Sequence, residues 1–580
     1  MNALLAGALV MAALALPVRL AGRQHRLLHL LQLEHYENPR LLLWLRRRGE
    51  LFSPRELAAL AALLVAAVVA RATGLPWLAA ALLLGGAPPL ALLGVREWRA
   101  EAIKPLIFTA RAKRLLALAL APAVLLALAA VAVALAGTPT AALAAVAALA
   151  WLLLALAPWT LVAANRALAP LQRSIDERYV RAARARLREV APTVVGITGS
   201  YGKTTTKFCT GAVLGADRRT LVTPESYNSL LGVVRTINER LRPEHSAFVV
   251  EMGMFRRGDI AELCDLVHPS IGVITAIGPM HLERLGSIEA IAKAKSELLD
   301  ALPSDGHFVT NAQDPRCLEL AARAHVPVTL FGIEAPPPSA GSGYSRAPQA
   351  PPSSISTSSA PVLARESAPP AAPQPQVIAR DLRLEAGRSV FELLLDGPGS
   401  EPIEVSAALL GRHNVANLLA AAAVGRALGL DAATIAAGLA TVQAPAHRLQ
   451  PIHNAAAGVT VIDDAYNSNP EGAAAALEVL RAHPARRRLL VTPGMVELGE
   501  LEPQLNRAFG EQAAAACDIA ILVGAARTAP IREGLEAAGM DGTAVHVVRD
   551  IGEATELLAR TTRAGDVVLF ENDLPDTYAA

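Results

Sequence analysis

Residues 194–207 read VVGITGSYGKTTTK and carry the clearest local signal in the chain. Apolar and β-branched residues lead into a turn that holds Gly199 and Gly202, and Lys203 and three threonines follow the turn. A strand that passes through a glycine-rich turn into the start of a helix is typical of loops that bind phosphate groups. The stretch therefore predicts a nucleoside triphosphate site in an α/β domain.

The strict phosphate-loop pattern, GxxxxGK, has its first glycine where this chain has Ile197, so the match is to a variant, TGSYGKTTT. In such a loop backbone N–H groups cradle the phosphates, the lysine neutralises them and a hydroxyl reaches Mg²⁺. Lys203 is thus predicted as a catalytic cation and Thr204 as a metal ligand. The residues expected to bind ATP are Gly199, Ser200, Tyr201, Gly202, Lys203, Thr204 and Thr205.

The chain of 580 residues is long enough for several domains, and its apolar excess lies in the first 165 residues. After them, strand-like apolar runs alternate with helical patterns, as in parallel α/β domains. A Pro-, Ser- and Ala-rich stretch over 334–376 predicts a disordered insertion. The predicted organisation is a transmembrane helical segment over 1–165, a central ATP-binding domain over 185–440 and a Rossmann-like C-terminal domain over 441–580.

Apolar runs in the first segment are candidate membrane spans, at 4–17, 57–70, 75–93, 115–136 and 141–164. Arginines and lysines gather after the first, third and fifth runs. By the positive-inside rule these basic segments face the cytoplasm, which predicts a multi-pass protein of the inner membrane with its catalytic domains in the cytoplasm. Two alternatives stay open: residues 1–18 as a cleaved signal peptide, and the second run as a buried helix of a soluble fold.

Two later stretches place carboxylates where parallel strands are expected to end. Glu251 closes the apolar run AFVVE, and Asp464 follows the apolar run in VIDDAYNSNPEG, residues 461–472. Ligands of open α/β sheets bind at the carboxyl ends of the strands. Glu251 is therefore predicted as a Mg²⁺ ligand. Asp464 is expected to contact the nucleotide, and Asn467 of the same loop the substrate.

The predicted helix over 288–302 carries a lysine on its apolar face. Ile291, Lys295 and Leu299 follow one another at intervals of four residues and share that face. Burial makes a lysine unfavourable as a cation, and a neutral lysine can react with CO₂ to give a carbamate that binds metal. Lys295 is predicted as a catalytic residue, either as this carbamate or as an ammonium that faces phosphate.

Motifs along the second part of the chain, taken together, resemble those of the Mur ligases: TGSYGKTTTK, VVEMG at 249–253, GPMHLERLGSIEAIAKAKSELL at 278–299, GRHNVAN at 411–417 and VIDDAYNSNPEG. The resemblance is closest to the branch that adds D-alanyl-D-alanine to the peptidoglycan precursor. It implies an ATP- and Mg²⁺-dependent enzyme that joins a carboxylate to an amine through an acyl phosphate. It also implies that His281 holds a second metal ion or the transferred phosphate, and that Asn414 and Arg448 contact the nucleotide.

Several segments depart from the pattern of that branch. TPESYNSLLG at 223–232 keeps Asn228 as a candidate substrate contact, and His447 stands where the family usually has glycine. VTPGMVELG at 491–499 and the acidic FENDLPDTY at 570–578 also differ from what the branch has. The domain that recognises the UDP end of the precursor is expected to be replaced by the membrane segment.

These departures leave the substrate open. The expected carboxylate donor is a cell-wall precursor, UDP-linked or lipid-linked, and the expected amine donor is an amino acid or a dipeptide. A membrane-anchored ligase or amidating enzyme acting on a lipid-linked precursor is the alternative, and a non-catalytic ATP-binding scaffold is an alternative of another class. The formal charge of +2, with no basic stripe that interleaves aromatic residues, gives no reason to expect a nucleic-acid partner.

Overall fold

The computed structural model describes residues 2–51, 91–99, 105–135, 149, 152–280, 282–334, 374–385, 387–466, 468–496 and 498–573. The chain divides into two compact units, a first up to Arg178 and a second from Tyr179 to Asp573. The predicted span over 57–70, most of that over 75–93 and most of the predicted insertion over 334–376 lie outside the described residues. The domain boundaries drawn from the sequence stay predictions.

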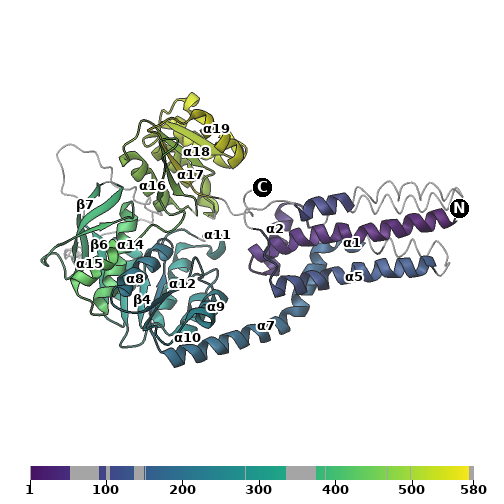
Figure 1. The fold of residues 1–580 in the computed structure, drawn as a ribbon, viewed down its shortest axis with the longest axis horizontal. Helices are drawn as coiled ribbons and strands as arrows, with labels where there is room; N and C mark the ends of the chain where they lie inside the picture. The colour runs from purple at the N-terminus through teal and green to yellow at the C-terminus, as the bar shows by residue number, and fades with distance from the viewer. Residues whose placement is uncertain are drawn as a thin grey trace, which may run out of the picture. The chain divides into compact units, whose positions relative to one another are not determined.

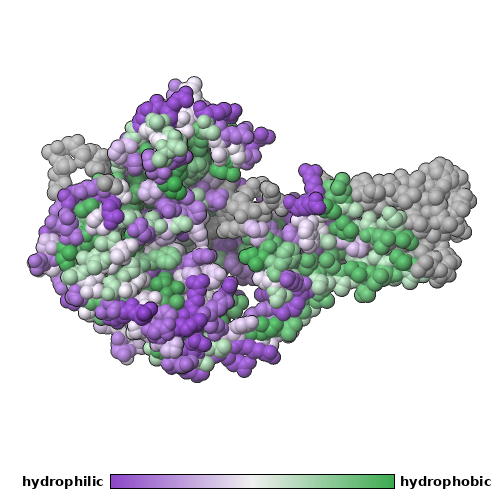
Figure 2. Space-filling view, in the orientation of Figure 1, coloured by the Kyte–Doolittle hydropathy of each residue, from purple (hydrophilic) through white to green (hydrophobic). Residues whose placement is uncertain are grey.

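The first unit is helical in its described part. It contains α1 (Asn2–Leu33), α2 (Asn38–Arg47), α5 (Ala110–Leu135) and most of α7 (Ala157–Val190), and α1 lies along α5 (Figure 1). Polar side chains link the helices: Gln24 Nε2 donates to the carbonyl of Ala157 at 2.9 Å, and Asn165 Nδ2 donates to that of Tyr36 at 2.9 Å. Much of the described surface of this unit is apolar (Figure 2).

The prediction of a multi-pass protein of the inner membrane is wrong. In the part of the chain that the structure describes, one helix, Ala110–Ala129, is long and apolar enough to cross a membrane. A single helix of this kind is weak evidence for a span, because a core helix of a soluble protein meets the same criteria. The helix α1 also continues through Arg19 and Arg26, in a segment that the sequence analysis places in a loop between spans.

The second unit begins with a nine-stranded sheet in the order β2-β3-β1-β4-β5-β6-β7-β8-β9. Neighbours from β2 to β7 run parallel, and β8 and β9 are added antiparallel. The strands are β1 (Thr193–Thr198), β2 (Thr220–Val222), β3 (Ala247–Glu251), β4 (Ile271–Ile274), β5 (His307–Asn311), β6 (Val328–Ile333), β7 (Val377–Glu385), β8 (Arg388–Leu394) and β9 (Ile403–Ala407). Because the strands are parallel, the loops after β1, β3 and β4 meet at one edge of the sheet.

Helices cover both faces of this sheet. On one face pack α8 (Lys203–Gly215), α14 (Arg412–Ala427) and α15 (Ala432–Ala440). On the other face pack the end of α7, α9 (Leu230–Arg240), α10 (Asp259–Val267), α12 (Ile288–Asp300) and α13 (Pro315–Ala322), with the short α11 (Leu282–Leu285) beside them. The sheet is therefore buried between two helical layers.

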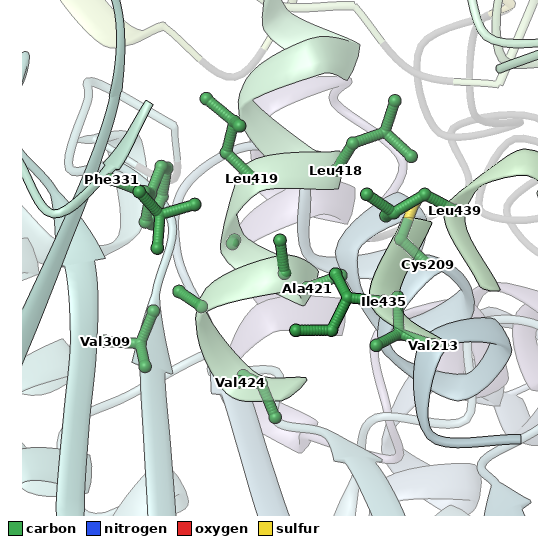
Figure 3. Close-up of a cluster of buried hydrophobic side chains, with 14 of the residues drawn as sticks. Cys209, Val213, Val309, Phe331, Leu418, Leu419, Ala421, Val424, Ile435 and Leu439 are labelled. Carbon is green, nitrogen blue, oxygen red and sulfur yellow. The ribbon is translucent and has the colours of Figure 1, made fainter. Parts of the chain in front are cut away.

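The helix α14 lies between the strands β5 and β6 on one side and the helices α8 and α15 on the other, as Figure 3 shows. Val309 of β5 and Phe331 of β6 lie on its sheet side, and Val213 of α8 lies on its other side (Figure 3). Small residues let these helices approach closely: a Cβ atom on Gly425 would lie 2.8 Å from Cγ1 of Val213. This packing fixes α8, whose first turn continues the phosphate loop.

A six-stranded sheet of order β10-β11-β15-β12-β13-β14 forms the rest of the second unit. Its strands are β10 (Gln450–Asn454), β11 (Val459–Asp464), β12 (Arg488–Thr492), β13 (Ile519–Val523), β14 (Val545–Val548) and β15 (Val567–Glu571). All pairs are parallel except β10 with β11. The helices are α16 (Pro470–Ala482), α17 (Glu502–Ala514), α18 (Ala525–Ala537) and α19 (Ile551–Thr561).

The α/β class with parallel sheets is confirmed. The strands after the predicted insertion, β7 and β8, pair antiparallel. The helices α14 and α15 are separate, because Gly429 adopts a left-handed φ of 78° and Asp431 caps the second helix by accepting a hydrogen bond from Thr434 N at 2.8 Å.

Candidate active site

The glycines of the phosphate loop stand where no side chain would fit. Gly199 has a φ of 152°, and a Cβ atom on it would lie 1.9 Å from Oγ1 of Thr275. Gly202 has a φ of 77°, and a Cβ atom on it would lie 2.3 Å from Oδ1 of Asn417. Both are needed for the loop to turn from β1 into α8, whose free N–H groups then face the same space as the loop.

Lys203 opens α8 and lies across the loop. Its Nζ donates to the carbonyl oxygens of Gly199 at 2.6 Å and Ser200 at 3.2 Å. Burial lowers the pKa of Lys203 to about 8, although the neighbouring Glu251 favours the charged form. The Ser200 hydroxyl donates to the carbonyl of Gly278 at 3.0 Å, which ties the loop to the segment after β4.

Glu251 ends β3 and points its carboxylate toward the phosphate loop. Its side chain is buried, and its Oε1 accepts a hydrogen bond from Asn228 Nδ2 at 2.9 Å. Its Oε2 lies 3.1 Å from Nζ of Lys207 and accepts no hydrogen bond from the described residues. Asn228, expected to contact substrate, therefore supports the predicted metal ligand, and Lys207 was not predicted at all.

Lys295 is buried on the inner face of α12, as the helical pattern predicts. Burial lowers its pKa well below the usual value, and the nearby ammonium of Lys203 lowers it further. Burial therefore favours the neutral amine form of the Lys295 side chain, which is the form that reacts with CO₂. Whether it carries a carbamate stays a prediction.

The start of α14 contributes amides and an imidazole. Asn414 Nδ2 donates to the carbonyl of Leu410 at 2.8 Å, and its Oδ1 accepts from Asn417 Nδ2 at 3.1 Å. Asn417 Oδ1 accepts in turn from the hydroxyl of Thr206 at 3.0 Å, which joins α14 to α8. The Nδ1 atom of His413 is buried without a hydrogen-bond partner in the described part of the chain, and burial lowers its pKa to about 4.

Residues after α15 complete the site from the second sheet. Asp464 ends β11, and its Oδ1 accepts a hydrogen bond from Leu449 N at 3.1 Å. Burial raises the pKa of Asp464 to about 6, while the nearby Arg448 favours its charged form. The guanidinium of Arg448 lies 4.2 Å from the ring centroid of Tyr466.

Two pockets lie among these residues. Both are lined by Tyr201, Gly202, Thr205, Arg448 and Asn469, so the two form one continuous region. The first pocket is lined further by Asn311, His413, Asn414, Asn417 and Asp464. The second is lined further by Lys203, Thr204, Asn228, Glu251 and Lys295. The structure thus brings together most of the predicted site residues, at the carboxyl edges of both sheets.

The side chains in these pockets suit ATP and Mg²⁺. The second pocket offers a glycine cradle, the N-terminus of α8 and the cations Lys203 and Arg448 for phosphate groups. A Mg²⁺ ion that is bound by substrate phosphates usually has only one or two oxygen ligands from the protein. Glu251 and Thr204 can supply these ligands. The first pocket carries amides and the unpaired Nδ1 of His413, groups that recognise a base and a ribose.

Two predicted site residues, His281 and Asn467, lie outside the described residues. The sequence analysis missed Lys207, His413 and Asn417 as members of the site. Lys207 and Asn417 are both within motifs that the sequence analysis singles out, at i+4 from Lys203 and i+3 from Asn414. Helical spacing therefore was the signal that could have found them.

The Mur ligase middle domain matches residues 197–350, and the Mur ligase glutamate ligase domain matches residues 447–571. A UDP-N-acetylmuramoyl-tripeptide--D-alanyl-D-alanine ligase of Mycobacterium leprae is 34% identical over 415 residues, which are 68% of this chain and 73% of the relative. The chain belongs to the Mur ligases. The corresponding ligase of Synechocystis sp. is 31% identical over 381 residues, 65% of this chain and 71% of the relative.

Solved Mur ligases share the fold. A MurF of Acinetobacter baumannii superposes with a TM-score of 0.56 at 26% identity, covering 70% of this chain and 78% of that chain. A MurF ligase of Thermotoga maritima, solved in complex with ADP, superposes with a TM-score of 0.55 at 24% identity, covering 70% of this chain and 81% of that chain. As a Mur ligase, the chain is an ATP-dependent, Mg²⁺-requiring enzyme that forms peptide bonds. None of the matches named here supports the membrane location predicted from the sequence.

Proposed function

We propose that this Mur ligase joins the carboxylate of a UDP-linked muramoyl tripeptide to the amine of D-alanyl-D-alanine. The names of the two relatives at 34% and 31% identity state this reaction for those proteins. The observation that carries the proposal is the second pocket, which is lined by Lys203, Thr204, Glu251, Lys295 and Arg448 among others. A pocket rich in cations, with one carboxylate for a metal ion, fits two anionic reactants.

The chemistry requires a good leaving group, because a carboxylate does not release oxide to an amine. ATP supplies this group when its γ-phosphoryl passes to the carboxylate, and the amine then displaces phosphate to form the amide. No strong acid or base is needed for the first step, so catalysis depends on position and electrostatic stabilisation. The residues of the second pocket offer both.

Each predicted residue has a distinct role in this proposal. Lys203 is assigned to the phosphate oxygens, and Thr204 and Glu251 to the Mg²⁺ ion. Asp464 and Asn414 are assigned to the nucleoside, since both line the first pocket. Arg448 lines both pockets and is assigned to neutralise phosphate. Lys295 is assigned to bind the carboxylate substrate or, as a carbamate, a metal ion.

The test uses the full chain with ATP, Mg²⁺, D-alanyl-D-alanine and either a UDP-linked or a lipid-linked muramoyl tripeptide. Phosphate release is followed together with the mass of the product. The proposal expects phosphate release that depends on both the tripeptide and the dipeptide, faster with the UDP-linked form, and a product whose mass equals the two substrates less water. The Glu251→Gln chain is the matched inactive control. No product with any of these precursors would contradict the proposal.

A further inference from the structure

One buried cation beside the candidate site has no role in the proposed chemistry. Lys207 lies one helical turn after Lys203 on α8, its side chain is fully buried, and it lines neither of the two pockets described above. Burial of a lysine is unfavourable unless its ammonium is paired and hydrogen-bonded. The partners of Lys207 therefore indicate what it does.

The ammonium of Lys207 contacts two different segments of the chain. Its Nζ lies 3.1 Å from Oε2 of Glu251, whose side chain is 1% exposed. It also donates a hydrogen bond to the carbonyl oxygen of Glu225. Its third side faces the ring of Phe208, whose centroid lies 4.5 Å away. A single ammonium thus joins the predicted metal ligand at the end of β3 to the loop between β2 and α9.

That loop reaches the same carboxylate from the other side. Asn228 Nδ2 donates to Oε1 of Glu251 at 2.9 Å, and Thr223 Oγ1 accepts from Glu251 N at 3.2 Å. Within the loop Glu225 has a φ of 42°, in the left-handed region that is unfavourable for a residue with a side chain. The hydrogen bond from Lys207 to the Glu225 carbonyl helps to hold this conformation, which keeps Asn228 in reach of Glu251.

We propose that Lys207 is a positioning residue that holds Glu251 in the orientation required for Mg²⁺ and locks the 223–229 loop against it. This inference rests on the proposed function, in which Glu251 binds the metal ion. Contacts at both oxygens fix the plane of the carboxylate, so that it need not be ordered when the ion binds. Substitution of a group that holds a metal ligand from behind in this way typically lowers metal affinity about 10- to 100-fold.

The first test measures pairing without any catalytic readout. Lys207→Met, Glu251→Gln and the double variant are compared with the parent chain by thermal unfolding in the absence of nucleotide and metal. Each single substitution leaves a buried partner without its opposite charge, so each is expected to lower the unfolding midpoint. The unfolding midpoint of the double variant is expected to fall by clearly less than the sum of the two single decreases. It is also expected to lie above the midpoint of Lys207→Met alone.

The outcomes of this cycle are all decisive. A Lys207→Met chain that cannot be obtained folded, with a double variant that can, supports the pairing as well. The pairing is overturned if the two decreases in unfolding midpoint simply add. It is also overturned if the double variant is less stable than either single variant or does not fold. Lys293→Met is the matched control, since Lys293 is an exposed lysine on α12 and its substitution is expected to leave the midpoint unchanged.

The second test asks whether the pairing serves the metal ion. For Lys207→Met, the Mg²⁺ concentration that gives half-maximal phosphate release is expected to rise about 10-fold. The KM for ATP at saturating Mg²⁺ is expected to change less than about twofold, because Lys207 lines neither pocket. Calorimetric titration of Mg²⁺ into the protein with a non-hydrolysable ATP analogue gives the same shift without turnover.

A lower Mg²⁺ requirement in Lys207→Met would overturn the proposal, since it would mean that the ammonium competes with the ion for Glu251. An unchanged requirement would overturn it as well. If the parent chain releases no phosphate with any precursor, the proposed function fails, while the unfolding cycle still reports on the pair. The two failures are therefore distinguishable.

Discussion

The carboxyl edges of the two sheets differ in the groups that surround a buried acidic side chain. At the edge of the nine-stranded sheet one carboxylate, Glu251, lies among the lysines 203, 207 and 295. At the edge of the six-stranded sheet Glu571 is fully buried and accepts hydrogen bonds from the hydroxyls of Ser468 and Thr492. Burial, together with the neighbouring Asp464, raises the pKa of Glu571 to about 8.

This difference indicates what each edge contributes to the binding of an anion. The first edge carries excess positive charge, which attracts phosphate and carboxylate groups. The second edge keeps Glu571 protonated at neutral pH, so this acid does not repel the same groups. Asp464 and Arg448 of this edge line the first pocket and are the proposed contacts to the nucleotide. Substitutions that reverse either arrangement test the comparison.

The largest effect is expected for Lys203→Met, which removes a cation from the first edge. The ammonium lies across the phosphate loop and has no substitute on that loop, so kcat/KM for phosphate release is expected to fall about 10²- to 10³-fold. The unfolding midpoint is expected to stay the same or rise, because burial already disfavours this charge. A loss of less than about tenfold, against the Lys293→Met control, would contradict the assigned role.

The substitution Glu571→Gln is also expected to have a large effect, which is a change in how the free energy of unfolding depends on pH. The folded chain keeps a proton on Glu571 that the unfolded chain releases near its ordinary pKa of 4.5, so the free energy of unfolding falls as pH rises from about 4.5 to about 8. Glutamine keeps one acceptor oxygen, offers an N–H donor to the second hydroxyl and cannot ionise, so it removes this dependence on pH. The variant is expected to match the parent chain near pH 4 and to unfold about 5 °C higher near pH 9. Parallel curves for the two chains over this range would contradict the assignment.

An intermediate effect is expected for Asp464→Asn, which removes charge from the second edge and keeps the acceptor for Leu449 N. Its carboxylate lines the first pocket, which is proposed to bind the nucleoside, so the KM for ATP is expected to rise about 10-fold at pH 8. Because the pKa of Asp464 is about 6, the parent chain is largely protonated at pH 5, where the two chains are expected to have similar KM values. A pH-independent ratio would show that the charge of Asp464 is not what binds ATP.

The first edge could be predicted from the sequence much better than the second. Strand β1, the glycine turn and the first turn of α8 are contiguous, so local pattern places Lys203 and Thr204 directly. Glu251 and Lys295 are candidates because each ends or interrupts an apolar pattern, and both line the second pocket. Helical spacing places Lys207 one turn after Lys203, but its partner Glu251 is 44 positions away along the chain, so the sequence does not show the pair.

The second edge depends on contacts between distant segments. Glu571 is buried by Ser468, which is 103 residues earlier, and by Thr492, which is 79 residues earlier. In sequence it belongs to an acidic segment that would ordinarily be solvated. The prediction of membrane spans failed for a related reason, because composition alone does not distinguish a span from a helix that packs within a helical unit.

The smallest effect is expected for His447→Gly, next to Arg448 at the second edge. His447 adopts a φ of 60°, and its imidazole Nδ1 lies 2.8 Å from Oδ2 of Asp463. Glycine removes the strain of the left-handed conformation, which stabilises the folded chain. It also loses the contact with Asp463, which contributes little because the imidazole is 57% exposed, and it makes the unfolded chain more flexible, which lowers stability. The free energy of unfolding is therefore expected to rise by less than about 1 kcal/mol, as denaturant titration would measure. Asp463→Asn, which removes the charge of the partner and keeps the backbone strain, is the control and is expected to lower stability slightly. A loss of more than about 1 kcal/mol in His447→Gly would show that the imidazole contact outweighs the strain, and that the second edge depends on this pair to hold Arg448 in place.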